Sequence, residues 1–266
     1  MPPDTGMYSQ EIWAPELHYI GHRWYMYFAN DDGNNNNHRI YVLENKDADP
    51  LSGHWIFKGK IADATNKWAI DASVFDCKGV NYIIWSGWSG DDNVSQNIYI
   101  AKLANPWTIE GQRAMISHPQ YDWEKHGSGN GLPFVNEGPE VLKNAGGNIF
   151  LTYSASGCWT DDYCLGMLTL KKDGDPMNPG DWTKSKTPVF TKSIENSVYG
   201  PGHNGFFQSP DGSEDWIVYH ANPKPGEGCA NFRSARMQQI KWNKDGTPDF
   251  GIPQKTGVPL QAPSGE

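Results

Sequence analysis

Residues 139–155, P-E-V-L-K-N-A-G-G-N-I-F-L-T-Y-S-A, contain the pattern that decides the fold. An apolar run leads into a turn of Asn and Gly, and an aromatic-containing run then ends in small residues. Two short runs joined by a Gly-containing turn predict a β-hairpin. Segments 15–29, 72–87 and 204–221 repeat the arrangement. The sequence therefore predicts four copies of one hairpin.

The repeats return at a regular spacing. Tyr27, Trp85, Tyr153 and Tyr219 take matching places in them, separated by 58, 68 and 66 residues. Each hairpin is followed by further strand-like runs, so each repeat supplies four strands in roughly sixty to seventy residues, which is typical of a β-propeller blade. A β-sandwich also has many short strands, but it does not return the same hairpin so regularly. We predict an all-β fold, a single β-propeller domain over residues 1–266 with about four recognisable blades.

Composition excludes several classes of function. The chain has 266 residues, a formal net charge of −9 and a pI near 5.3, which argues against a nucleic-acid partner because phosphate binding needs a basic face. No apolar run approaches the roughly 18 residues of a membrane span, and M-P-P-D-T-G-M-Y does not resemble a signal peptide. Aromatic residues make up 13% of the chain, which suits a surface that stacks on sugar rings, although core packing explains most of them equally well.

The four cysteines suggest one disulfide. Cys158 and Cys164 flank the short loop W-T-D-D-Y, and we interpret them as a local disulfide across that turn. Cys77 and Cys229 lie far apart and are interpreted as free, buried thiols, although sequence alone does not establish connectivity.

Functional groups recur at the start of the repeated hairpins. The innermost strands of a propeller line a central channel, so residues just before them meet at one mouth of it. That position holds Asp71 in the second repeat, Glu137 in the third and His203 in the fourth. Alone, Asp71 is expected to stabilise a turn and His203 to be a hydrogen-bonded core histidine. Because all three fall at one repeat position, we predict that they converge on a site.

Several motifs together resemble glycoside hydrolase family 43. They are I-W-A-P-E-L-H (12–18), W-A-I-D (68–71), W-E (123–124), V-N-E-G-P (135–139), G-P-G-H-N (200–204) and R-S-A-R-M-Q (233–238). The resemblance runs from about residue 8 to the C-terminus and is strongest to the exo-acting α-L-arabinofuranosidases. It implies a five-bladed β-propeller, a secreted protein, and inverting hydrolysis of terminal arabinose from arabinan or arabinoxylan.

The resemblance also implies roles for particular residues. Glu137 would be the general acid and Asp71 the carboxylate that orients it and tunes its pKa. Arg233 would contact the terminal sugar, and His203 would lie under the site, in some members beside a metal ion. No cofactor is expected to be required, and a Ca²⁺ ion in the axial channel is the metal to consider.

One departure from the family concerns the catalytic base. In the family it is an aspartate of the first blade, upstream of the W-A-P-E motif, and this sequence starts only a few residues before that motif. We therefore expect the base-bearing blade to be missing and water activation to be impaired.

Four aromatic residues are candidates for stacking on the sugar, although ordinary packing is at least as good an account of any one: Trp13, Trp88, Trp159 and Tyr199. Two other functions stay open. One is β-xylosidase activity, since the family pocket accepts either pentose. The other is a carbohydrate-binding propeller without catalysis.

Overall fold

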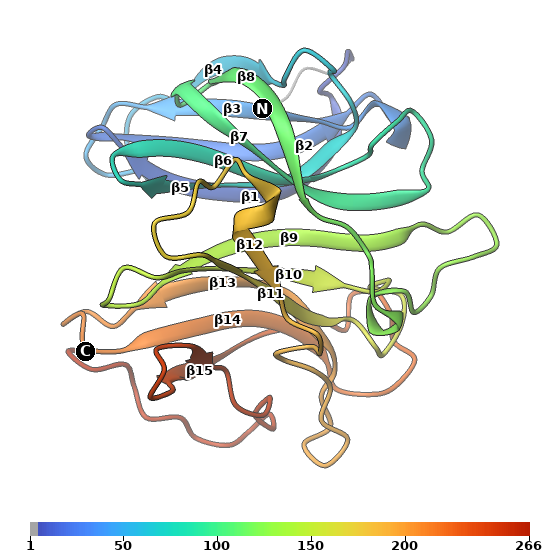
Figure 1. Cartoon of the computed structure of the whole chain (residues 1–266), viewed down its shortest axis with the longest axis vertical. Coiled ribbons are helices and arrows are strands. Elements are labelled where there is room, and N and C mark those ends of the chain that lie inside the picture. Colours follow the sequence, from blue (N-terminus) through green and yellow to red (C-terminus); the bar gives the residue numbers. More distant parts are fainter. Residues whose placement is uncertain (1–4) are drawn as a thin grey trace. The chain divides into compact units, whose positions relative to one another are not determined.

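The computed structural model describes residues 5–266, and these form β-strands and loops with three short 3-10 turns at Asn35–Asn37, Asp122–Glu124 and Pro179–Asp181 (Figure 1). The all-β prediction is confirmed. Within residues 5–266 no helix is long and apolar enough to cross a bilayer. The chain divides into two compact units, the first ending at His118 and also including Pro176–Pro179, the second comprising the rest. A single propeller domain therefore stays a prediction.

The first unit contains two four-stranded antiparallel groups among its described residues. The strands are β1 (Gln10–Ile20), β2 (Arg23–Asp31), β3 (Arg39–Asn45), β4 (Ile56–Ile61), β5 (Ala69–Cys77), β6 (Val80–Gly87), β7 (Ser95–Asn105) and β8 (Thr108–Ser117). In each group the neighbours pair in chain order. The two groups pack face to face around a buried cluster that includes Tyr25, Tyr27, Ile83 and Trp85. Alternating side chains of each strand supply that cluster.

The second unit repeats the arrangement in its own residues. Its strands are β9 (Phe134–Lys143), β10 (Ile149–Ala155), β11 (Cys164–Leu170), β12 (Trp182–Lys184), β13 (Tyr199–Gln208), β14 (Asp215–Asn222), β15 (Ser234–Trp242) and β16 (Pro248–Asp249). Strands β9–β12 form one antiparallel group and β13–β16 the other. A core that includes Phe150, Leu165, Ile217 and Tyr219 joins them. The predicted hairpins are thus confirmed as β1–β2, β5–β6, β9–β10 and β13–β14.

The first strand of every hairpin contains the same β-bulge, in which two residues face one on the next strand. The bulged pairs and the residues opposite are Ala14-Pro15 with Phe28, Asp71-Ala72 with Trp85, Gly138-Pro139 with Tyr153, and His203-Asn204 with Tyr219. The first residue of each pair has a positive φ: 42° at Ala14, 55° at Asp71, 54° at Gly138 and 46° at His203. Residues with a Cβ rarely adopt that conformation, and when they do it is often at a functional site.

The bulges correct the alignment of the repeats. Asp71 and His203 are equivalent, but the equivalent residue in β9 is Gly138, so Glu137 lies one position earlier than predicted. Glu137 is also inside a strand and not at a strand-to-loop corner. In the first repeat the residue opposite the bulge is Phe28, not Tyr27. The residue pairings on either side of each bulge therefore align the four repeats, which residue types alone did not do.

The disulfide prediction was wrong. Cys158 pairs with Cys229, and their Cα atoms are 5.3 Å apart. Cys77 and Cys164 are the free thiols, and both are buried. Cys164 opens β11 and points into the core, where burial raises the pKa of its thiol to about 12. The disulfide joins two loops of the second unit that are 71 residues apart in sequence.

Candidate active site

Glu137 is half-buried in β9, and a tyrosine holds its carboxyl group. The hydroxyl of Tyr163 donates a hydrogen bond of 2.7 Å to Oε1 of Glu137. Tyr163 is 1% exposed, so its ring is fixed by packing. Its edge lies over Gly202, where any Cβ would collide with the ring. A small residue at 202 is therefore part of what allows Tyr163 to reach the carboxylate.

The backbone around Glu137 is tied to the neighbouring strands. Ser154 is opposite Glu137 in the ladder, and its Oγ accepts a 2.7 Å hydrogen bond from the backbone N–H of His203. Gly138 lies against the His203 ring, because a Cβ at that glycine would be 3.3 Å from the imidazole. The positive φ and the close ring together explain why a glycine follows Glu137. His203 and Glu137 are thus brought together within the second unit.

Arg233 is exposed on the loop between β14 and β15, and a histidine holds its guanidinium. Its Nη1 lies 3.1 Å from Nε2 of His220, in β14. A guanidinium only donates, so Nε2 is the acceptor and the ring is neutral. Burial, together with the charge of Arg233 and the nearby His203, lowers the pKa of His220 to about 3. The ring also stacks on Tyr163 at an interplanar angle of 6°.

A buried carboxylate, Glu124, anchors the strand that carries Glu137. It has no exposed surface. Its Oε1 accepts hydrogen bonds from Asn136, Tyr153 and Lys184, and its Oε2 accepts from the backbone N–H groups of Gln120 and Tyr121, all between 2.7 and 3.1 Å. Burial alone would raise the pKa of Glu124, but these bonds, led by that from Lys184, lower it overall. Asn136 directly precedes Glu137, so the network holds β9 in place beside the candidate acid.

In the first unit Asp71 is buried at the β5 bulge, 6% exposed and with its backbone in the left-handed region. The nearby Trp88 is not a sugar platform, and that prediction was wrong. Trp88 is 1% exposed and stacks on Trp68 with ring centroids 4.8 Å apart. Ala29 and Ile70 complete this small core cluster. Trp88 supports the strand that carries Asp71.

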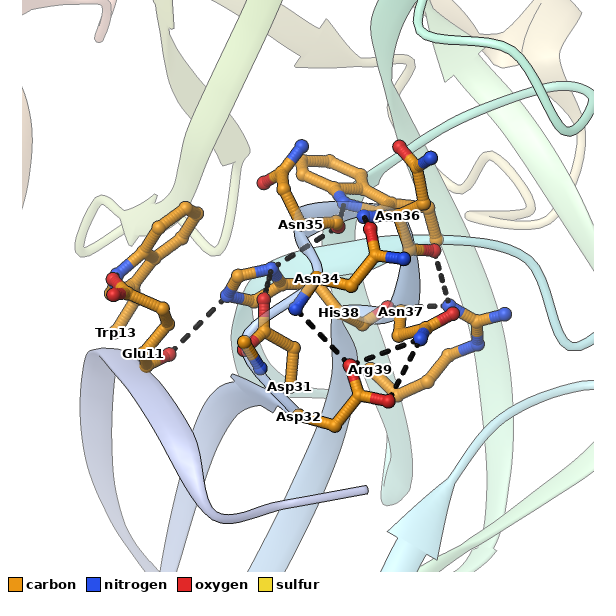
Figure 2. A network of polar contacts seen from close by, with 12 residues as sticks. Glu11, Trp13, Asp31, Asp32, Asn34, Asn35, Asn36, Asn37, His38 and Arg39 are labelled. Carbon is orange, nitrogen blue, oxygen red and sulfur yellow. Dashed lines mark hydrogen bonds and ion pairs between the residues drawn. The ribbon is translucent and has the colours of Figure 1, made fainter. Parts of the chain in front are cut away.

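Trp13 does present a ring at the surface of the first unit. Its side chain is 37% exposed and stacks on His38, with centroids 3.9 Å apart. Figure 2 shows His38 inside a polar network, with Nδ1 3.0 Å from Asp31 and Nε2 3.2 Å from the carbonyl of Glu11. The carbonyl of Asn35, in the N-N-N-N turn that leads into His38, also accepts from Trp68. The asparagine run at 34–37 therefore contributes, through the carbonyl of Asn35, to fixing His38.

Two other predicted contact residues lie in the second unit. Trp159 follows the disulfide half Cys158, is half-buried, and donates from Nε1 to the carbonyl of Gly127 at 3.0 Å. Tyr199 opens β13 and is half-buried. Sugar contact by Trp159 and Tyr199 stays a prediction.

The described residues contain no ligand set that matches the Ca²⁺ site considered near His203. Among residues 5–266 no three His, Cys, Asp or Glu side chains are grouped so that they could hold a metal ion. A Ca²⁺ site needs several oxygen ligands, which His203 does not supply.

Three residues at the site were missed by sequence reasoning: Tyr163, His220 and Glu124. In the sequence, Tyr163 lies in the loop W-T-D-D-Y and His220 at the end of a predicted hairpin, and neither position marks a site. Glu124 belongs to the W-E motif but had no assigned role. A polar residue in an otherwise apolar strand end, such as the His in V-Y-H-A at 218–221, was the available signal.

Comparison with known proteins gives a consistent result. The model of glycosyl hydrolases family 43 matches residues 2–248, and the chain belongs to this family. It is 44% identical over 262 residues to an extracellular exo-α-(1→5)-L-arabinofuranosidase of Streptomyces avermitilis, covering 96% of this chain and 52% of that protein. It is 42% identical over 260 residues to α-L-arabinofuranosidase 43 of Humicola insolens, again covering 95% of this chain and 52% of the relative. The chain thus spans about half the length of these two relatives.

Solved structures agree. The crystal structure of an α-L-arabinofuranosidase from Lactobacillus brevis matches with a TM-score of 0.87 and 38% identity, covering 97% of this chain and 81% of that one. A thermostable family-43 glycoside hydrolase matches with a TM-score of 0.79 and 26% identity, with coverage of 97% and 79%. The family resemblance inferred from the motifs is confirmed.

Proposed function

We propose that this chain is the catalytic β-propeller part of a secreted, exo-acting α-L-arabinofuranosidase that removes terminal arabinose from arabinan or arabinoxylan. The observation that carries the proposal is the arrangement around Glu137, a carboxyl group held by buried Tyr163 in the same unit as the Arg233–His220 pair. The names of the relatives support the substrate class. The Cys158–Cys229 disulfide supports an oxidising, extracellular location.

The proposed roles follow inverting glycoside hydrolysis. One carboxylic acid protonates the leaving oxygen while a carboxylate activates water on the opposite face of the sugar. Glu137 is the proposed acid and Asp71 the carboxylate that tunes it. Arg233 and His203 are proposed to bind the sugar. We assign no residue as the general base.

Hydrolysis by Glu137→Gln tests the acid role. A natural (1→5)-linked arabino-oligosaccharide has a poor leaving group that requires protonation, whereas 4-nitrophenol leaves with little help. We therefore expect a loss of kcat/KM of about 10²- to 10⁴-fold on the oligosaccharide and a smaller loss on 4-nitrophenyl α-L-arabinofuranoside. Glu195→Gln, at an exposed position of the second unit, is the matched control and should leave both rates unchanged.

The same assay separates the rival functions. Faster turnover of 4-nitrophenyl β-D-xyloside than of the arabinofuranoside would favour a β-xylosidase. Binding of arabino-oligosaccharides without turnover, unaltered by Glu137→Gln, would favour a non-catalytic binding propeller. Wild-type oligosaccharide hydrolysis by Glu137→Gln would refute the acid assignment.

A further inference from the structure

Two rings, those of Tyr163 and His220, lie between the candidate acid and the candidate sugar-binding arginine. Tyr163 precedes β11 and donates to Glu137 at 2.7 Å. His220 is in β14 and lies 3.1 Å from Nη1 of Arg233. The two rings are stacked, with centroids 5.7 Å apart and planes within 6° of parallel. Groups from two different strand layers of the second unit are therefore linked through one stack.

The stack is held from both sides. Tyr163 lies against Gly202, and in the β13–β14 ladder Gly202 is directly opposite His220. The ring centroids of His203 and His220 are 6.2 Å apart, so the His203 imidazole flanks His220 on the β13 side. A displacement of either ring would therefore have to displace the other ring or the β13 backbone.

We propose that Tyr163 and His220 are a coupled pair of positioning residues, which fix the Glu137 carboxyl and the Arg233 guanidinium relative to each other. The proposal rests on the proposed function for the roles of Glu137 and Arg233, but the coupling itself is geometric. Tyr163 acts through one hydrogen bond to the acid. His220 acts as a neutral acceptor that holds the exposed arginine on its loop. Neither is proposed to touch the reacting atoms.

The two interactions have separable consequences. A hydrogen bond donated to a carboxylate favours its charged form. Tyr163→Phe keeps the ring stack and removes that bond, so it should move the basic limb of the kcat/KM pH profile upward by about one pH unit and leave KM within about twofold. His220→Phe keeps a ring in the stack and removes the acceptor, so it should raise KM roughly tenfold, the equivalent of about 1.4 kcal/mol, with no shift of that limb.

The coupling is tested by a third variant. Tyr163→Leu removes the hydrogen bond and the stacking partner together. If the stack positions Arg233, this variant should show the pH shift of Tyr163→Phe and, in addition, a rise in KM approaching that of His220→Phe. A KM equal to that of Tyr163→Phe would overturn the coupling.

A matched control separates positioning from ordinary destabilisation. Tyr153→Phe also removes a buried tyrosine hydroxyl, which donates a hydrogen bond of 2.9 Å to Oε1 of Glu124. It should lower the thermal midpoint but leave the pH limb in place. An equal pH shift in Tyr153→Phe and Tyr163→Phe, or no shift in either, would contradict the proposal.

Readouts independent of hydrolysis keep the test valid if the chain proves inactive. The side-chain ¹³C signal of Glu137 should titrate about one pH unit higher in Tyr163→Phe than in wild type. The ¹⁵N signal of His220 Nε2 should be that of an unprotonated, hydrogen-bonded acceptor and should change in Arg233→Met. If these signals behave as expected while hydrolysis is absent, the positioning inference stands and the proposed enzymatic function fails. If they do not change, the positioning inference fails whatever the activity.

Discussion

Replacing Glu124 with glutamine should destabilise the second unit more than any surface substitution. Glu124 is completely buried and accepts five hydrogen bonds, three on Oε1 and two on Oε2. Glutamine offers one oxygen and one NH₂ group, so in either orientation the NH₂ faces groups that also donate. Lys184, whose side chain is only 11% exposed, would lose its counter-charge. Breaking such a buried pair from one side costs about 3–5 kcal/mol.

The assay is chemical and thermal unfolding of the full chain. A loss of that size should lower the thermal midpoint by on the order of 10 °C for a protein of this length. Glu195→Gln is the matched exposed control and should stay within about 0.5 kcal/mol of wild type. The double variant Glu124→Gln/Lys184→Met removes both charges of the buried pair, so it should recover part of the loss. A Glu124→Gln protein within 1 kcal/mol of wild type would refute the view that this network anchors β9.

The same carboxylate predicts a pH dependence of stability. The pKa of Glu124 in the folded protein is below the ordinary value of 4.5, so its contribution to the free energy of unfolding is fully present above pH 4.5. The contribution is lost as the pH falls through the lower, folded pKa. The difference in unfolding free energy between wild type and Glu124→Gln should therefore be constant from about pH 8 to 5 and decrease in more acidic buffer. A difference that grows on acidification would have the wrong sign.

Three further predictions concern covalent and backbone constraints. Cys158→Ser/Cys229→Ser should lose about 2–4 kcal/mol, because the disulfide closes a span of 71 residues, and denaturation of the wild type with and without reductant should show the same loss. Asp71→Gly should be more stable than Asp71→Ala by about 1 kcal/mol in the free energy of unfolding, because only glycine adopts φ +55° without strain. Equal denaturation midpoints of the two variants would argue against backbone strain at the bulge. Gly138→Ala should lose about 1–3 kcal/mol from its φ of +54° and from the contact of its Cβ with His203, and unchanged stability would show that the bulge relaxes easily.

The sequence by itself determined the features that depend on local pattern and turn chemistry. All four hairpins appear where apolar and aromatic runs flank a turn, because strand pairing across a short turn is specified by residues close in the chain. The family motifs also placed Glu137, Asp71, His203 and Arg233 among the candidates without any coordinates.

Only the tertiary structure decided which distant residues meet. Cys158 pairs with Cys229 and not with its neighbour Cys164, which is buried at the start of β11. The paired strands also show that Gly138, not Glu137, is the residue of β9 equivalent to Asp71 and His203. Tyr163 and His220 are 57 residues apart in the printed sequence, yet their rings stack. Contacts of this kind depend on how sheets pack face to face, and no local pattern of residue types encodes them.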